Sequence, residues 1–308
     1  MFRYLSAVAI CIAGIAGAQT IPAPGLVPQA EGRPLMLHFA QGREWAPVPY
    51  EAVKGDILFQ ATVNGRPASV LLDNGTERTL VDAGFAQRLG IGLRAFTGQA
   101  VTGASTRLAM SGTDTVTMEA PHAFTIKGPL VAIDLTPMST ALGRRVDAVL
   151  GADMLDHFAV MIQPGKRLLS LAASGNITGQ AGTVVVPLIE GNLIEAEING
   201  QPVRLRVDLG FNGVIRLTDA AWQRAFPAGS TGAGSQTTAD GVTRITRSGR
   251  AELRIGDVRA RNVAVDSGYA PDGASQGLLG NGFLSRGTSV LDVKKKQLML
   301  VPRQPSAK

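Results

Sequence analysis

The chain has 308 residues, of which 37 are glycine and 18% are charged, and its formal net charge at pH 7 is +6. Its single cysteine leaves no pair for a disulfide, and its three histidines have no ligand-like spacing, so we expect neither a metal site nor a cofactor. The basic residues are scattered and only 5% of residues are aromatic, which argues against a nucleic-acid partner.

The N-terminal residues have the order of a secretory signal peptide. Arg3 precedes an apolar run over residues 5–15, and the small residues Ala-Gly-Ala follow at positions 16–18. The run is shorter than the ~20 apolar residues of a membrane-spanning helix, which would be the alternative. We therefore expect a signal peptide over residues 1–18, no transmembrane segment, and an exported protein that is periplasmic or secreted.

Residues 19–49 are rich in proline and show no clear periodicity. Two interpretations remain open for this N-terminal extension. It either lies along the domain that follows it or is disordered.

An internal duplication dominates the rest of the chain. Residues 63–75 read VNGRPASVLLDNG, and residues 198–210, at an offset of 135, read INGQPVRLRVDLG. Both copies contain Asn-Gly, the preferred two-residue hairpin turn, and an apolar strand that ends in Asp-x-Gly. Each copy therefore predicts a β-hairpin that ends in an aspartate, Asp73 in the first copy and Asp208 in the second.

A second pair of repeated elements follows the hairpins. Residues 149–151 read Val-Leu-Gly and residues 278–280 read Leu-Leu-Gly, each followed by an apolar strand, a basic turn and another strand. The last basic turn is Lys294-Lys295-Lys296. Short helices are predicted at residues 81–89 and 218–225, just after each Asp-x-Gly loop.

The repeats divide the chain into two similar halves. We place an N-terminal lobe at residues 50–173, a linker rich in glycine, serine and threonine at 174–182, a C-terminal lobe at 183–303, and a short tail at 304–308. The abundance of glycine and β-branched residues predicts an all-β fold.

Asp-x-Gly alone does not identify a site, because the triplet occurs four times, at Asp73, Asp82, Asp208 and Asp266. The repeat aligns Asp266 with Asp134 at the end of a different strand, and Asp82 falls inside a predicted helix. Only Asp73 and Asp208 end matching strands and enter matching loops.

The order of hairpin, Asp-x-Gly, helix, apolar-apolar-Gly and final strand pair resembles the retropepsin-like aspartic proteases, over nearly all of the chain after residue 49. The resemblance implies two aspartic-protease-type lobes in one chain, a single-chain pseudo-dimer that is a monomer, with flaps near residues 97–106 and 237–243. It also implies that Asp73 and Asp208 share one proton at the lobe junction. Together they would activate a water molecule that attacks a peptide bond of a polypeptide substrate.

The two loops depart from the Asp-Thr-Gly or Asp-Ser-Gly of that family. They read Asp73-Asn74-Gly75 and Asp208-Leu209-Gly210, so the hydroxyl that normally bonds across the lobe interface is missing. The amide of Asn74 can replace part of that bonding, whereas Leu209 has no side-chain donor or acceptor. Each glycine lets its loop turn tightly and approach the other one.

Three hypotheses about function therefore remain open. The first is an exported aspartic endopeptidase. The second is a catalytically inactive pseudoprotease that binds peptide or an envelope protein in the same cleft. The third is a structural β protein whose Asp-x-Gly loops are relics.

Overall fold

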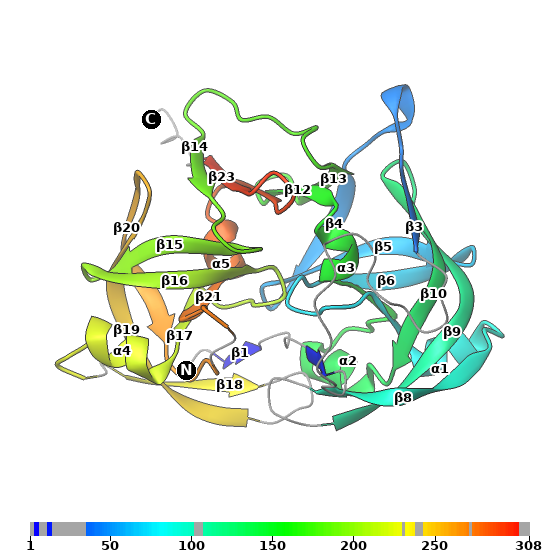
Figure 1. Cartoon of the computed structure of the whole chain (residues 1–308), viewed down its shortest axis with the longest axis horizontal. Coiled ribbons are helices and arrows are strands. Elements are labelled where there is room, and N and C mark those ends of the chain that lie inside the picture. Colours follow the sequence, from blue (N-terminus) through cyan, green and yellow to red (C-terminus); the bar gives the residue numbers. More distant parts are fainter. Residues whose placement is uncertain are drawn as a thin grey trace, which may run out of the picture.

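The computed structural model describes residues 3–5, 11–13, 35–101, 107–229, 232–237, 243–270 and 273–301. Two β lobes lie side by side, and a further layer of strands joins them along one edge (Figure 1). The fold is all-β with short helices, as the sequence predicts. Within the described ranges, no helix is both long enough and apolar enough to cross a membrane.

The first lobe is built from the strands that precede and surround the first Asp-x-Gly. β5 and β6 form the predicted hairpin, and its turn residues Asn64 and Gly65 have φ of 49° and 74°, a conformation that these two residue types tolerate best. The elements of this lobe are β4 (Val48–Val53), β5 (Asp56–Val63), β6 (Arg66–Leu72), β7 (Leu80–Asp82), α1 (Ala83–Arg88), β8 (Leu93–Val101), β9 (Arg107–Ala120), β10 (Phe124–Ile133), α2 (Thr136–Leu142), β11 (Ala148–Leu150) and α3 (Ala152–Leu155).

The second lobe repeats this plan. Its hairpin turn at Asn199 and Gly200 has φ of 51° and 77°, nearly the values of the first copy. Its elements are β15 (Leu193–Ile198), β16 (Gln201–Asp208), β17 (Ile215–Leu217), α4 (Asp219–Ala225), β18 (Gly232–Thr237), β19 (Thr243–Ile255), β20 (Val258–Asp266), β21 (Gly277–Gly280) and α5 (Asn281–Leu284).

The apolar-apolar-Gly segments pass behind the aspartate loops. β11 pairs in parallel with β6 and antiparallel with β7, and β21 pairs in the same way with β16 and β17. Every residue of β11 and β21 is buried, which explains why they read as unbroken apolar runs.

The two predicted helices after the loops exist with shorter bounds. The prediction that Asp82 lies inside a helix is wrong: it ends β7 and caps α1, with its carboxylate accepting a hydrogen bond from the Phe85 amide at 2.7 Å. Thr218 caps α4 in the same way through the Ala221 amide. The sequence signal that was misread is the aspartate at the helix start, which is a preferred capping residue.

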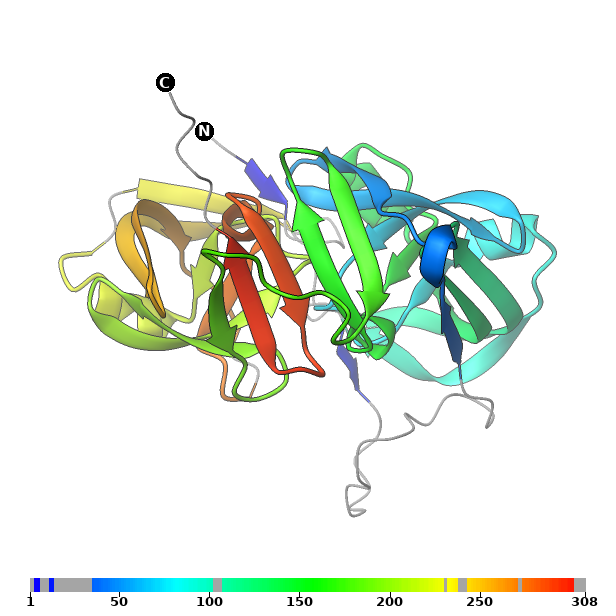
Figure 2. The same ribbon diagram turned by 90° about the horizontal axis from the view of Figure 1, so that it is seen from above.

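A sheet shared by both lobes was not foreseen. The final strand pairs of the two halves pair with each other through β12 and β22, and β14 and β4 extend this sheet on either side (Figure 2). The Lys294–Lys296 turn connects its last two strands, as predicted. The joining strands are β12 (Phe158–Gln163), β13 (Leu168–Ala173), β14 (Val184–Pro187), β22 (Thr288–Asp292) and β23 (Gln297–Val301).

The N-terminal segments touch both lobes. In the extension, β3 (Met36–Phe39) pairs antiparallel with β10 of the first lobe, and a 3₁₀ turn follows at Gly42–Glu44. β1 (Arg3–Leu5) pairs in parallel with β18, and β2 (Cys11–Ala13) pairs antiparallel with β8. The predicted cleavage position near Ala18 and residues 19–34 lie outside the described residues.

Asp292 fastens the interlobe linker to the shared sheet. It is fully buried and accepts hydrogen bonds from Ser174 Oγ at 2.6 Å and from the amides of Gly175 and Lys295 at 2.8 and 3.1 Å. These donors lie on both sides of the β12–β22 contact, so the carboxylate links the two halves of the chain.

Asp292→Ala is expected to lower the free energy of unfolding by about 3 kcal/mol, because it leaves these donors without an acceptor. Urea unfolding followed by circular dichroism measures the change. The exposed Asp257→Ala is the control and should shift stability by less than about 0.5 kcal/mol. Equal stability of both variants would contradict the role given to Asp292.

Candidate active site

Asp73 and Asp208 stand at equivalent positions in the two lobes. Asp73 directly follows β6 and Asp208 is the last residue of β16, and their exposed fractions are 0% and 1%. The Asp73 amide donates to the Leu150 carbonyl of β11 at 3.1 Å, and Asp208 pairs with Gly280 of β21. In each lobe, the buried strand β11 or β21 therefore fixes the position of the aspartate at the end of the neighbouring strand.

The two carboxyl groups converge on one point, and the glycines of the loops leave room for this approach. A Cβ placed on Gly75 would lie 3.0 Å from Oδ1 of Asp73 and also 3.0 Å from Oδ1 of Asp208. A Cβ on Gly210 would overlap the carboxyl group of Asp73. Both positions must be glycine because each loop passes directly against the carboxyl group of the opposite lobe.

Each loop is also held from behind by the short helix that follows the apolar-apolar-Gly strand. The amide of Ala152 in α3 donates to the Thr76 carbonyl at 2.8 Å, and that of Asn281 in α5 donates to the Phe211 carbonyl at 2.7 Å. A Cβ on Gly151 or Gly280 would overlap loop carbonyl oxygens, so the glycine that ends each repeated motif is required by this close approach.

Asn74 supplies the bonding across the lobe interface. Its Nδ2 donates to the Val207 carbonyl at 3.0 Å, and its Oδ1 accepts from the Leu209 amide at 2.6 Å. One buried side chain from the first loop thus hydrogen-bonds to the residues on both sides of Asp208. Leu209 makes no equivalent bond in return: its side chain packs in the apolar core, and its carbonyl accepts from Asn281 Nδ2.

The environments of the two aspartates differ. Thr76 Oγ1 donates to Asp73 Oδ2 at 2.7 Å, whereas Phe211, the third residue after Asp208, offers no hydroxyl. In the second lobe the buried Arg216 stacks over the Phe211 ring at 4.4 Å and acts on Asp208 through its charge.

Sequence reasoning missed both Thr76 and Arg216. For Thr76 a signal was present, because its hydroxyl lies only three residues after Asp73. Arg216 lies in a strand that reads as core, and nothing in the pattern marks a buried arginine.

Burial raises the pKa of both carboxyl groups. Desolvation, and then the charge of Asp208, raise the pKa of Asp73 to about 7, against the hydrogen bonds from Thr76 and Gly75. Desolvation raises the pKa of Asp208 to about 6, and the Gly210 amide and the charges of Arg216 and Arg206 oppose this rise. The pair therefore keeps one proton into the neutral range, and the cations of the second lobe favour the ionised form of Asp208.

The other Asp-x-Gly aspartates stay outside this arrangement. Asp82 caps α1, and Asp266 ends β20, where its carboxyl group lies near Arg216. Within the described residues, no three His, Cys, Asp or Glu side chains are grouped closely enough to hold a metal ion.

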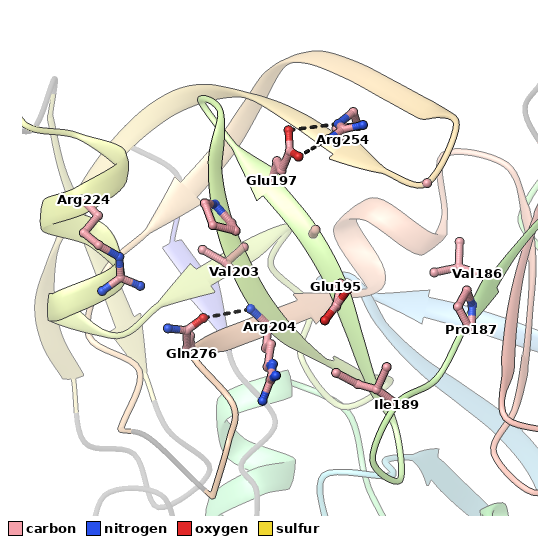
Figure 3. Close-up of a pocket in the computed structure, with 13 residues that line it drawn as sticks. Val186, Pro187, Ile189, Glu195, Glu197, Val203, Arg204, Arg224, Arg254 and Gln276 are labelled. Carbon is pink, nitrogen blue, oxygen red and sulfur yellow. Dashed lines mark hydrogen bonds and ion pairs between the residues drawn. The ribbon is translucent and has the colours of Figure 1, made fainter.

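A surface cavity of about 750 Å³ lies elsewhere, on the outer face of β15 and β16 (Figure 3). Arg254 is ion-paired with Glu197 there, and Arg204 and Arg224 reach into the same region. Neither aspartate loop contributes to its lining, so this cavity is not part of the Asp73–Asp208 site.

Two family models match the chain, one in each lobe. Residues 59–154 match the family described as "Aspartyl protease", and residues 194–286 match the family described as "gag-polyprotein putative aspartyl protease". Each match contains one aspartate loop and the apolar-apolar-Gly strand behind it. No curated protein matched the chain.

Asn74→Ala is expected to lower the free energy of unfolding by about 2–3 kcal/mol, because it removes both cross-lobe bonds and leaves the Leu209 amide buried without an acceptor. Asn74→Thr should lose clearly less, since a hydroxyl can accept one bond and donate the other. Denaturant unfolding of the three proteins measures this order. An Asn74→Ala protein as stable as the wild type would show that these cross-lobe bonds do not contribute to stability.

Proposed function

The chain belongs to the retropepsin-like aspartyl proteases, with two such domains in tandem, and we propose that it is an endopeptidase with Asp73 and Asp208 as its catalytic pair. The observation that carries the proposal is the convergence of these two buried carboxyl groups on one point at the lobe junction. Two carboxyl groups so placed hold a single proton, and this is the state that aspartic-protease chemistry needs.

Chemistry at this pair follows from the shared proton. The ionised carboxylate takes a proton from a water molecule as the water oxygen bonds to the peptide carbonyl carbon, and the protonated carboxyl group donates its proton to the carbonyl oxygen. Collapse of the tetrahedral intermediate then breaks the C–N bond. The carboxyl group that took the water proton gives it to the leaving amine, and the other carboxylate takes a proton from a hydroxyl of the intermediate, which restores the shared proton. Arg216 and Arg206 favour Asp208 as the carboxylate that starts the reaction and Asp73 as the acid.

The substrate that fits this arrangement is an extended polypeptide. β8 of the first lobe and β18 of the second lie at the lower edge of Figure 1, and each pairs with a short strand from the N-terminal segment. Strand pairing of this kind binds a chain through its backbone and leaves side chains to set preference. Because the N-terminal sequence has the order of a signal peptide, we propose that the protease is exported and acts as a monomer in the periplasm or outside the cell.

A second candidate function is a pseudoprotease that binds peptide in the same cleft without cutting it. Leu209 and Phe211 favour this candidate, because they leave the second loop without the side-chain hydroxyl that the first loop receives from Thr76. A loop with less support holds its carboxylate less accurately, and catalysis is sensitive to errors of that kind.

Asp73→Asn and Asp208→Asn are each expected to lower kcat/KM for cleavage of an unfolded protein by at least ~10³-fold, because either change removes one of the two proton-transfer groups. Wild-type cleavage should decline as the pH rises above about 7, where the shared proton is lost, and also in acid, where both groups are protonated. Fluorescent casein assayed from pH 3 to 9 measures both effects.

Asp134→Asn, an exposed aspartate at the end of β10, is the matched control and should leave the rate unchanged. Folded wild-type protein that binds but does not cut peptides would favour the pseudoprotease. Activity that survives in both dyad variants would mean that the catalytic site lies elsewhere.

A further inference from the structure

A third carboxyl group, that of Asp56, is buried beside the aspartate pair. Asp56 is the first residue of β5, its exposed fraction is 0%, and the charges of Asp73 and Asp208 both act on it. Neither the shared-proton chemistry nor the Asp-x-Gly pattern uses this residue. The repeat offset of 135 places Gly191 opposite Asp56, so the acid is present in only one of the two copies.

Asp56 contacts the loop of the other lobe. Asn212, four residues after Asp208, donates from Nδ2 to Asp56 Oδ2 at 3.0 Å. The turn before Asp56 is also pressed against Asn212, because a Cβ on Gly55 would lie 3.0 Å from the Cβ of Asn212. The β4–β5 turn of the first lobe therefore packs directly on the loop that carries Asp208.

Two oxygen atoms in this contact have no hydrogen-bond partner among the described residues. They are Oδ1 of Asp56 and Oδ1 of Asn212, and both are buried. An ionised Asp56 offers only acceptors, so it can satisfy neither oxygen. A proton on Asp56 Oδ1 changes this, because that oxygen then donates and the Asn212 oxygen accepts.

We propose that Asp56 is held as a neutral carboxylic acid that pairs through two hydrogen bonds with the Asn212 carboxamide, and that this acid–amide pair positions the loop carrying Asp208. One bond is the donation from Asn212 Nδ2, and the other is the donation from Asp56 Oδ1 to Asn212 Oδ1. The pair complements Asn74, which bonds to Val207 and Leu209 on either side of Asp208.

The charges around Asp56 support the neutral form. Burial, and then the charges of Asp73 and Asp208, raise its pKa well above the usual range for aspartate, against the hydrogen bond from Asn212 and the charge of Lys54. Lys54 is the only cation among these groups, and its Nζ donates to the Ala141 carbonyl at 2.7 Å. A neutral Asp56 also keeps a third negative charge away from the pair.

The protonation state is tested by unfolding the protein at a series of pH values, independently of any activity. A carboxyl group whose pKa is raised by folding stabilises the protein fully in acid and loses that contribution as the pH rises toward the folded-state pKa. From about pH 5 upward, the folding constant of the wild type should therefore fall relative to that of Asp56→Asn, by up to about tenfold per pH unit.

Asp147→Asn is the matched control. Asp147 is also buried, but it is paired with Arg145 at 2.5 Å and accepts from the Ser69 amide at 3.0 Å. Its replacement should destabilise the protein without the same pH trend. A constant ratio between wild type and Asp56→Asn across this range would mean that Asp56 is ionised, and it would overturn the proposal.

The positioning role rests on the proposed function and has its own test. An asparagine at position 56 can donate to Asn212 Oδ1 and accept from Asn212 Nδ2, so Asp56→Asn should keep kcat within about threefold, whereas Asp56→Leu should lose at least tenfold in kcat with KM little changed. Equal kcat in both variants would overturn the positioning role. A wild type that does not cleave would overturn the proposed function and leave the unfolding test of the acid–amide pair valid.

Discussion

Two carboxyl groups buried at one point cannot both carry a charge at moderate cost, and the structure around Asp73 and Asp208 depends on this constraint. The charge that remains must be held by hydrogen bonds, and the loops provide them through their own amides and through Thr76. The loop glycines let each loop approach the carboxyl group of the opposite lobe, and the buried strands β11 and β21 fix the positions of the loops. The shared sheet holds the two lobes together.

The two repeated loops are supported in different ways. The first loop provides the cross-lobe bonds through Asn74, and the second has the apolar packing of Leu209 and the nearby charge of Arg216. A single asparagine makes both bonds because its amide can accept and donate at once. Loss of the hydroxyl in both loops is therefore compatible with a connected interface.

Much of this arrangement is readable in the sequence. The repeated hairpins, the aspartates at their ends and the Lys294–Lys296 turn follow from local patterns with a clear physical cause, such as the backbone preference of Asn-Gly. The bonds of the Asn74 amide were foreseen only as a possibility of its chemistry. Whether the two aspartates are catalytic remains a prediction.

Other features depend on contacts between distant parts of the chain, and no local pattern marks them. The shared sheet pairs β12 with β22, and Asp56 meets Asn212 across 156 positions. The burial of Asp56 and Arg216 follows from lobe packing, so their residue type alone would have placed them at the surface. The capping role of Asp82 was missed because its Asp-x-Gly triplet was assigned to the interior of a helix.

The most direct test of the account is a titration of the aspartate carboxyl groups by ¹³C NMR on the side-chain-labelled protein, with Asp73→Asn and Asp208→Asn used to assign the pair. The account predicts that one proton stays on the pair into the neutral range and that removing either aspartate lowers the pKa of the other, because the negative charge beside it is gone. If both groups instead ionise independently near pH 4, as isolated aspartates do, the two carboxyl groups do not share a proton and the central claim is wrong.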